Sequence, residues 1–234
     1  MPPSIVVLTG AGVSAESGLA TFRDPAGIWS KVRIEDMATL EAFARNPARV
    51  HAFYNARRHQ LTEPAIQPNE AHRALARLEG AWPAPFLLVT QNVDDLHARA
   101  GSRKLLPMHG ALRRVRCASC GKTVAWEGDL EETVACAGCG SARLRPDIVW
   151  FGEIPYGLDE IETSLQGCDL FVSIGTSGSV YPAAGFVASV RGRARTVELN
   201  LQPSEGTPLF DEARHGPATE IVPRFVDELL QQWG

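Results

Sequence analysis

Short apolar runs recur along the chain, and each ends where glycine or polar residues begin. The runs are Ile5–Leu8, Phe86–Val89, Leu170–Ile174 and Thr196–Leu199. The residues that follow them are Thr9-Gly10-Ala11-Gly12, Thr90-Gln91-Asn92, Gly175-Thr176-Ser177 and Asn200. Brief apolar runs bounded in this way are typical of strands that are buried on both faces. We therefore predict four buried strands.

Helical segments alternate with these strands. Asn69–Leu78 and Ala183–Val190 have a helical pattern, and a helix-compatible stretch around Ser14-Ala15-Glu16 follows the glycine turn after the first strand. Such alternation predicts an α/β fold with a Rossmann-like parallel sheet and helices on both of its faces. Ligands of these folds bind beyond the carboxyl ends of the strands, so we expect the functional residues there.

Two segments do not follow the alternating pattern. Trp29–Pro68 is predicted to be largely helical and is rich in Arg and Ala, whereas Arg113–Pro146 contains four of the five cysteines. We predict a dinucleotide-binding domain made of residues 1–30, 72–112 and 147–234. A helical insertion (residues 31–71) and a zinc ribbon (residues 113–146) would together form a small domain.

Composition narrows the class of protein. The chain has 234 residues, of which 44% are apolar and 21% charged, and no apolar run is long enough to cross a bilayer. The N-terminus does not resemble a signal peptide, so we expect a cytoplasmic protein without a membrane partner. A net charge of −4 argues against nucleic acid as a partner but leaves a basic peptide substrate open. We expect a monomer.

The four clustered cysteines form two CxxC pairs. Cys117 and Cys120 are separated by fifteen residues from Cys136 and Cys139, and a glycine follows each pair. Paired CxxC turns place four thiolates in a tetrahedron around zinc, and such a filled shell leaves no site for a reactive water. We therefore predict one structural zinc ion. Cys168 stands apart before an apolar run, and we interpret it as a buried thiol.

Polar residues at the predicted strand ends are candidates for chemistry. The small residues of Thr9–Ser14 could let backbone N–H groups approach a phosphate at the start of a helix, although an ordinary strand-to-helix turn remains an alternative. Gln91-Asn92-Val93-Asp94 would face the ligand crevice. His109 precedes the cysteine segment, at the junction of the two predicted domains, where a general base could act near neutral pH.

Five separate motifs together resemble the sirtuin family across nearly the whole chain. They are Gly10-Ala-Gly-Val-Ser-Ala-Glu-Ser-Gly-Leu-Ala-Thr-Phe-Arg23, Gln91-Asn-Val-Asp94, His109-Gly110, the two CxxC pairs and Gly175-Thr-Ser177. One departure is Ala20, where the family often has proline. The resemblance implies an NAD-dependent protein-lysine deacylase, in which the acyl oxygen attacks C1′ of the nicotinamide ribose, nicotinamide leaves and O-acyl-ADP-ribose forms.

The resemblance also implies roles for particular residues. The catalytic residues would be His109, Asn92 and Asp94. His109 would deprotonate a ribose hydroxyl, and Asp94 would bind the nicotinamide carboxamide. The NAD-binding set would comprise Gly10, Ala11, Gly12, Ser14, Ala15, Glu16, Thr21, Phe22, Arg23, Trp29, Gln91, Asn92, Val93, Asp94, His109, Gly175, Thr176, Ser177, Asn200, Leu201, Gln202 and Ala218. The segment Val149-Trp150-Phe151-Gly152-Glu153 resembles the strand that pairs with the substrate peptide.

A second, smaller resemblance indicates which acyl groups the protein would remove. Tyr54 and Arg57 are three residues apart and would project from one face of a helix. Sirtuins of the sirtuin-five-like class carry this Tyr-x-x-Arg pair, together with a small residue at the position of Ala38, and remove succinyl, malonyl or glutaryl groups. A guanidinium can grip the distal carboxylate of such groups. The alternative is a solvated helix on which Arg57 and Arg58 face water.

Two other functions stay open on the sequence. The CxxC pairs by themselves would also fit a zinc ribbon that binds nucleic acid, although the acidic charge and the lack of an aromatic and basic stripe count against it. A protein ADP-ribosyltransferase on the same fold would use the same cofactor. Its product, ADP-ribosylated protein, would distinguish it from a deacylase.

Overall fold

Six strands form one parallel sheet in the computed structural model, which describes residues 1–20 and 33–233 of the chain. Their order is β3 (Leu105–Pro107), β2 (Phe86–Thr90), β1 (Ile5–Thr9), β7 (Leu170–Ile174), β8 (Arg195–Asn200) and β9 (Glu212–His215). Numbered along the chain, this is the order 3-2-1-4-5-6 of a Rossmann fold. The winding reverses between β1 and β7, which places the ligand crevice at their carboxyl ends.

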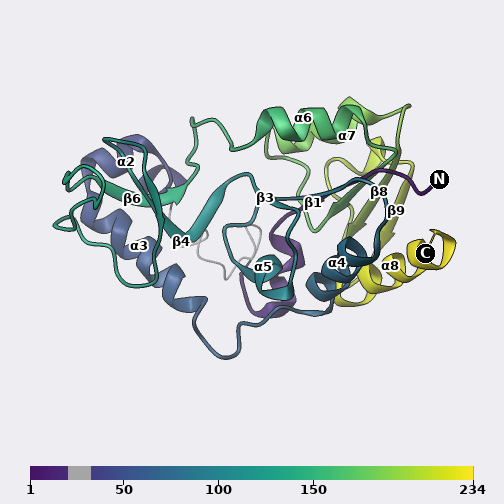
Figure 1. Cartoon of the computed structure of the whole chain (residues 1–234), viewed down its shortest axis with the longest axis horizontal. Coiled ribbons are helices and arrows are strands. Elements are labelled where there is room, and N and C mark those ends of the chain that lie inside the picture. Colours follow the sequence, from purple (N-terminus) through teal and green to yellow (C-terminus); the bar gives the residue numbers. More distant parts are fainter. Residues whose placement is uncertain (21–32, 234) are drawn as a thin grey trace.

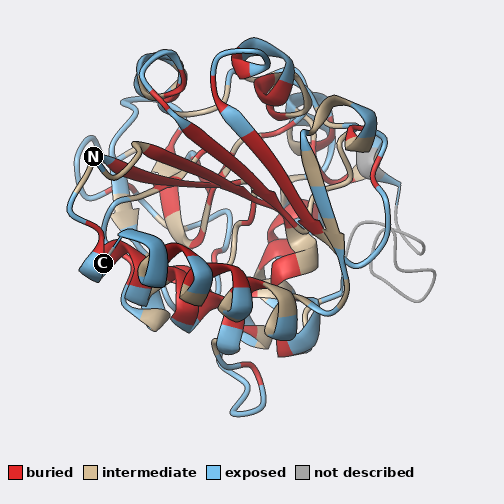
Figure 2. Ribbon diagram, turned by 90° about the vertical axis from the view of Figure 1, so that its right-hand side faces the viewer, coloured by how far each residue is buried: buried red, intermediate tan, exposed pale blue. Residues whose placement is uncertain are grey.

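Helices cover both faces of this sheet, whose strands are buried between them (Figure 2). On one face, α4 (Glu70–Ala81) and α8 (Ala218–Trp233) pack against alternate strand residues such as Val7 and Val172. On the other face are α6 (Leu158–Gln166), η4 (Ala183–Gly185) and α7 (Phe186–Val190). Cys168 is 3% exposed in this second cluster, which confirms its interpretation as a buried thiol.

A second, three-stranded antiparallel sheet lies at the other end of the molecule (Figure 1). Its strands are β5 (Thr123–Ala125), β4 (Gly110–Cys117) and β6 (Leu144–Ile148), in that order. We call residues 110–148 the cysteine module. The helices α2 (Leu40–Arg45) and α3 (Pro47–Gln60) lie beside it, preceded by η3 (Ile34–Asp36). The division into two domains with the predicted boundaries remains our proposal, which the separation of the two sheets supports.

Helix α3 is joined to the cysteine module by hydrogen bonds from side chains to the backbone. The side-chain amide of Asn55 donates to the Leu130 carbonyl at 3.1 Å and accepts from the Leu130 backbone N–H at 3.0 Å. Arg58 is fully buried and donates to the carbonyl of Leu112 at 2.8 Å and to that of Gly128 at 3.2 Å. The alternative in which Arg58 faces water is therefore wrong, and α3 depends on the module for its position.

The structure corrects two local predictions. The stretch after the glycine turn is no α-helix but two single 3-10 turns, η1 (Ala11–Val13) and η2 (Ala15–Ser17), and the second ends at Gly18 in the left-handed region. Residues 149–153 do not form a strand, because β6 ends at Ile148 and the chain turns at Gly152, whose φ is 88°. Only one isolated bridge remains in that segment, between Phe151 and Thr39.

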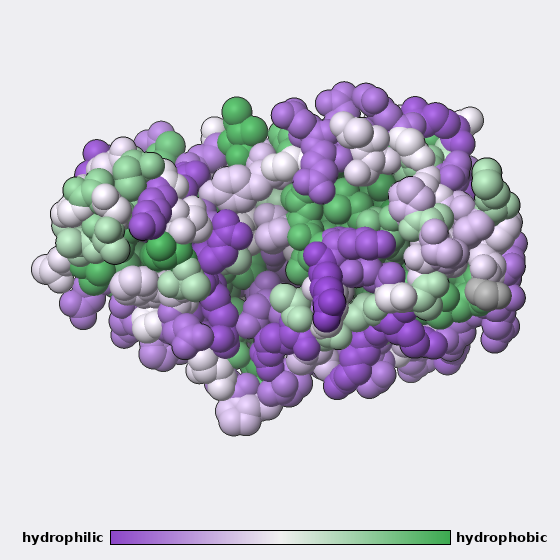
Figure 3. All heavy atoms as spheres, viewed as in Figure 1, coloured by the Kyte–Doolittle hydropathy of each residue, from purple (hydrophilic) through white to green (hydrophobic). Residues whose placement is uncertain are grey.

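The surface seen in Figure 3 is mostly hydrophilic, with apolar patches on both parts of the molecule. Within residues 1–20 and 33–233, none of the helices combines the length and the apolar character that crossing a bilayer requires. The cytoplasmic location and the monomeric state stay predictions.

Candidate functional site

A cleft of about 640 Å³ lies at the carboxyl ends of the central strands and extends to the cysteine module. Gly10, Gln91, Gly175 and Leu201 each directly follow one of the strands β1, β2, β7 and β8, and all four line it. Every described residue that the sequence predicted to contact NAD or substrate also lines this cleft. Thr21, Phe22, Arg23 and Trp29 lie outside the described residues. The sequence did not predict Leu19, Ala20, Gln60, Leu61, Leu112, Ile148, Pro155, Val180, Tyr181, Pro182, Leu199 and Pro217 as site residues.

The two glycine loops at the floor of the cleft touch backbone to backbone. A Cβ atom on Gly12 would lie 2.7 Å from the Cα of Gly175, and one on Gly10 would lie 2.8 Å from the Gly175 oxygen. Gly175 itself has a φ of 62°, which favours glycine. The small residues therefore allow the β1 and β7 loops to meet. Residues 11–17, in the described part of the loop after Gly10, form 3-10 turns, so within them the predicted phosphate contact depends on backbone N–H groups and not on an α-helix dipole.

Ser14, Asn92 and Asp94 form one hydrogen-bonded group inside the cleft. The Ser14 hydroxyl donates to Asp94 Oδ2 at 3.0 Å and accepts from Asn92 Nδ2 at 3.1 Å. The backbone N–H of Leu96 donates to the other Asp94 oxygen at 3.0 Å. Burial raises the pKa of Asp94, and the bonds from Leu96 and Ser14 partly offset this. The group is thus a fixed polar surface with its amide and carboxylate held in place.

Glu16 anchors one side of the cleft. Its carboxylate accepts hydrogen bonds from the Thr219 backbone at 3.0 Å and from the Thr219 hydroxyl at 2.7 Å. Ala218, next to Thr219, lines the cleft at the start of α8. The predicted NAD contacts at Glu16 and Ala218 are therefore brought together by the packing of η2 against α8.

His109 lies between β3 and β4, where the large sheet passes into the cysteine module. Its Nδ1 is 3.0 Å from the carbonyl oxygen of Gln91. Because a carbonyl only accepts, Nδ1 bears the hydrogen and Nε2 is the basic nitrogen of the neutral ring. Burial lowers the pKa of His109, although the bond to Gln91 opposes the shift. The histidine is thus a neutral base near pH 7 in the wall of the cleft.

Two further histidines lie behind the cleft. The rings of His72 and His97 meet edge to face, with centroids 4.7 Å apart. His72 Nδ1 lies against Asn69, the residue that caps α4, and His97 Nε2 is 3.0 Å from the Thr9 hydroxyl. Burial lowers the pKa of His72 to about 4 and that of His97 well below its ordinary value. Both rings are neutral in the native protein near pH 7.

We expect the chain to lose stability as the pH falls from 6.5, the ordinary pKa of histidine, towards the native pKa of His72, about 4. In that window the unfolded chain binds protons that native His72 does not accept, so acid favours unfolding. We would measure the unfolding free energy of wild type and of His72→Gln in urea. The value for wild type minus that for the variant should decrease by about 2 kcal/mol between about pH 7.5 and about pH 5. A difference that stays constant with pH would contradict this.

Tyr54 and Arg57 both face the cleft from α3, as the spacing predicted. Tyr54 is 3% exposed, and its hydroxyl accepts a hydrogen bond from the indole of Trp150 at 2.9 Å. Arg57 is half-buried and packs over the Phe53 ring at 6.0 Å. No ion pair joins Arg57 to a carboxylate within residues 1–20 and 33–233. Burial lowers its pKa, and attraction to Tyr54 and Asp94 offsets this only in part.

The segment 149–153 lines the cleft beside α3, to which Trp150 is hydrogen-bonded, and contacts the small residue Ala38. The backbone N–H of Phe151 donates to the Ala38 carbonyl at 3.0 Å, and the Phe151 side chain is 50% exposed. Glu153 lines the cleft, but Arg145, Arg116 and the Trp150 backbone all donate to its carboxylate. Its carboxylate therefore holds the local structure together.

The four cysteine sulfurs fit a zinc ion. All of them lie within 4.8 Å of one another, and the pairs Cys117–Cys139 and Cys120–Cys136 are separated by 3.7 and 3.8 Å. Zinc–sulfur bonds of about 2.3 Å in a tetrahedron require sulfur–sulfur distances of roughly 3.8 Å. The sulfurs are thus positioned to bind one zinc ion with no coordination position left for a substrate.

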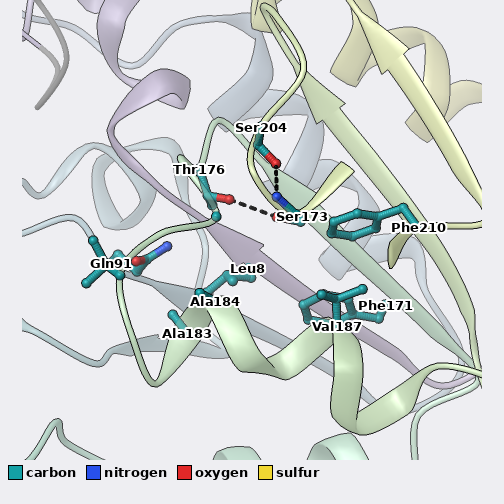
Figure 4. A pocket seen from close by; sticks show the side chains of 13 residues that line it. Leu8, Gln91, Phe171, Ser173, Thr176, Ala183, Ala184, Val187, Ser204 and Phe210 are labelled. Carbon is teal, nitrogen blue, oxygen red and sulfur yellow. Dashed lines mark hydrogen bonds between the residues drawn. The ribbon is translucent and has the colours of Figure 1, made fainter. Parts of the chain in front are cut away.

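A second, small pocket adjoins the cleft and shares Gln91, Thr176 and Val180 with it (Figure 4). Leu8, Phe171 and Val187 give it apolar walls, and a bond of 3.1 Å joins the hydroxyls of Ser173 and Thr176 at its edge. Its volume of about 20 Å³ is enough for a single water molecule. A pocket of this size is too small for a substrate.

The Rossmann-ordered sheet, the cleft at its switch point and the attached cysteine module define a dinucleotide-dependent enzyme with a structural metal site. The model of the Sir2 family matches residues 10–182, and the chain belongs to this family. A Sir2 homologue in complex with NAD is 39% identical, with a TM-score of 0.89 over 99% of this chain and 91% of its own. Another, bound to a myristoylated histone peptide, is 32% identical, with a TM-score of 0.75 over 98% and 92%.

Two curated relatives are both described as NAD-dependent protein deacylases. The NAD-dependent protein deacylase of Salmonella typhimurium is 56% identical over 98% of this chain and 85% of its own. That of Bdellovibrio bacteriovorus is 56% identical over 97% of both chains. The prediction of an NAD-dependent protein deacylase is confirmed at this level, together with the predicted fold class and cofactors. The relatives do not favour the ADP-ribosyltransferase alternative.

Proposed function

We propose that this deacylase removes succinyl and malonyl groups, as well as acetyl groups, from protein lysines and produces nicotinamide and O-acyl-ADP-ribose. The observation that carries the proposal is Arg57, a half-buried guanidinium in the cleft without an ion-pair partner among the described residues. A partly desolvated cation gains most from an anion that arrives with the ligand. The distal carboxylate of a succinyl or malonyl group is such an anion.

The size of the cleft agrees with this substrate class. Ala38 is 6% exposed at the cleft wall, and its single methyl group leaves room in the cleft for a chain longer than acetyl. Tyr54 adds a hydroxyl to the guanidinium of Arg57 on the same helix face. The pair can therefore provide one charge-assisted contact and one hydrogen bond to a carboxylate.

His109 is the base that we assign to the reaction. Its Nδ1 is held by Gln91, so Nε2 can accept a proton from a ribose hydroxyl when NAD occupies the cleft. Asp94 and Asn92, fixed through Ser14, would hold the nicotinamide end of NAD. The Gly175 loop and residues 200–202 would bind its phosphate and adenosine parts, with Ala218 at the adenine edge.

The substrate peptide would lie along residues 149–153 and present its modified lysine to the cleft. The exposed Phe151 side chain at that edge can pack against an extended peptide. Recognition through the backbone and a few apolar contacts tolerates many sequences, as expected of an enzyme with several protein substrates.

Arg57→Met tests the acyl specificity. We expect kcat/KM on a succinyl-lysine peptide to fall about 30-fold to about 5,000-fold, corresponding to roughly 2–5 kcal/mol, because the carboxylate loses its charged partner. Activity on the matched acetyl peptide should change far less. Arg49→Met is the control, since Arg49 lies exposed on the same helix and outside the cleft. An unchanged succinyl-to-acetyl ratio in Arg57→Met would refute the proposal.

A further inference from the structure

The hydroxyl of Tyr54 is polarised by Trp150. The indole Nε1 of Trp150 lies 2.9 Å from Tyr54 Oη, and both side chains are buried, at 2% and 3% exposure. An indole N–H can only donate, so the phenol oxygen must be the acceptor. The hydrogen of the phenol is then left for another acceptor. Tyr54 and Trp150 both line the cleft, where an acidic substrate would supply one.

Three residues fix the position of Trp150: Arg145 and Phe43 contact its ring, and Glu153 accepts from its backbone. The guanidinium carbon of Arg145 lies 3.6 Å from the centre of its ring, and Phe43 packs beside it at 5.3 Å between centroids. Arg145 is bonded to both oxygens of Glu153, at 2.8 and 2.7 Å, and Glu153 also accepts from the Trp150 backbone at 2.9 Å. The indole therefore has one orientation, and so has the hydrogen bond that it donates.

Tyr54 keeps its hydrogen under working conditions. Burial raises the pKa of Tyr54 to about 12, and the bond from Trp150 lowers it only in part. The phenol is therefore protonated near neutral pH and can donate. A carboxylate in the cleft is the strongest acceptor that such a hydroxyl can meet.

We propose that Trp150 is a positioning residue for acidic acyl groups, because its N–H fixes the Tyr54 hydroxyl as a donor towards the carboxylate that Arg57 attracts. This inference rests on the proposed desuccinylase and demalonylase function. It makes a chemical distinction within the substrates: an acetyl group has no distal carboxylate, so the orientation of the phenol does not affect its binding. Trp150 is thus part of the specificity of the cleft through its indole nitrogen.

Trp150→Phe removes this N–H and keeps an aromatic ring over Arg145. We expect the succinyl-to-acetyl ratio of kcat/KM to fall about tenfold, mostly through a higher KM for the succinyl peptide. The acetyl peptide serves as the internal reference for any general damage to the cleft. Trp82→Phe is the matched control, because the Trp82 indole is also buried and donates at 2.9 Å, but to Pro3 at the N-terminus.

A double substitution tests whether Trp150 acts through the hydroxyl of Tyr54. In a Tyr54→Phe background, Trp150→Phe should change the ratio by less than about twofold, since the acceptor of its hydrogen bond is gone. Full additivity of the two substitutions, or an unchanged ratio in Trp150→Phe alone, overturns the inference while Arg57→Met still reports the proposed function. If Arg57→Met also leaves the succinyl-to-acetyl ratio unchanged, the cleft does not recognise a carboxylate through Arg57. The proposed function and the role of Trp150 are then both refuted.

Discussion

Replacing His109 with alanine is expected to lower kcat for deacylation by about 10²- to 10⁴-fold while NAD still binds. The reason is that Nε2 is the basic nitrogen left free by the bond from Nδ1 to the Gln91 carbonyl. Removing the ring takes away the proton acceptor but leaves the Ser14, Asn92 and Asp94 group intact. Single-turnover assays and titration of NAD by calorimetry measure the two properties separately.

His59→Ala is the control for this substitution, because His59 lies exposed on α3 beside Asp129. The pH profile gives a second readout: burial lowers the pKa of His109, so the acidic limb of kcat/KM should have its midpoint below 6.5. Turnover that survives in His109→Ala, or an acidic limb that is identical in both proteins, would remove His109 from the mechanism.

Removal of zinc is expected to unfold the cysteine module and leave the six-stranded sheet folded. Five buried residues form the core of the module, and two of them, Cys117 and Cys136, are among the four cysteines positioned to bind zinc. So small a core does not hold a fold without the metal, whose binding contributes on the order of 10–16 kcal/mol in small zinc sites. Chelation should abolish hydrogen-exchange protection in β4, β5 and β6 first.

The same experiment reports on the acyl pocket. Because Asn55 and Arg58 bond to the module, α3 should also lose protection, and with it the placement of Arg57. Metal analysis should give one zinc per chain in wild type and in Cys168→Ala, the control with a distant buried cysteine, but none in Cys120→Ser. Simultaneous loss of protection in β1 and β7 would show that the module and the sheet unfold as one unit.

The central strands could be predicted from the chain because parallel strands buried on both faces need unbroken apolar runs, as in Ile5–Leu8 and Leu170–Ile174. Two edge strands gave no such signal. β9 has the sequence Glu-Ala-Arg-His with alternate residues exposed, and β3 contains Pro107. Helix α8 includes Pro223, a residue that usually marks a helix boundary. These elements are defined by their neighbours in the sheet and the core.

The site could be predicted in part for a similar reason. Residues that follow the strands, such as Gln91 and Gly175, must lie at one edge of the sheet once the strands are parallel, so their position in the chain fixes their place in the cleft. The predicted strand at residues 149–153 was wrong because Glu153 bonds to the Trp150 backbone and Gly152 turns the chain. Contacts of this kind depend on side-chain directions that apolar patterning does not specify.

The sequence by itself determined the four central strands, the four predicted zinc ligands and the groups available at the strand ends, because these depend on residue type and short-range spacing. Only the tertiary structure decided how the groups act. Trp150 reaches Tyr54 across 96 residues, Arg58 is buried against the cysteine module, and neighbouring Arg57 faces the cleft. The direction of a hydrogen bond and the pairing of a charge are set by atoms in contact, and those contacts form between segments that are far apart in the chain.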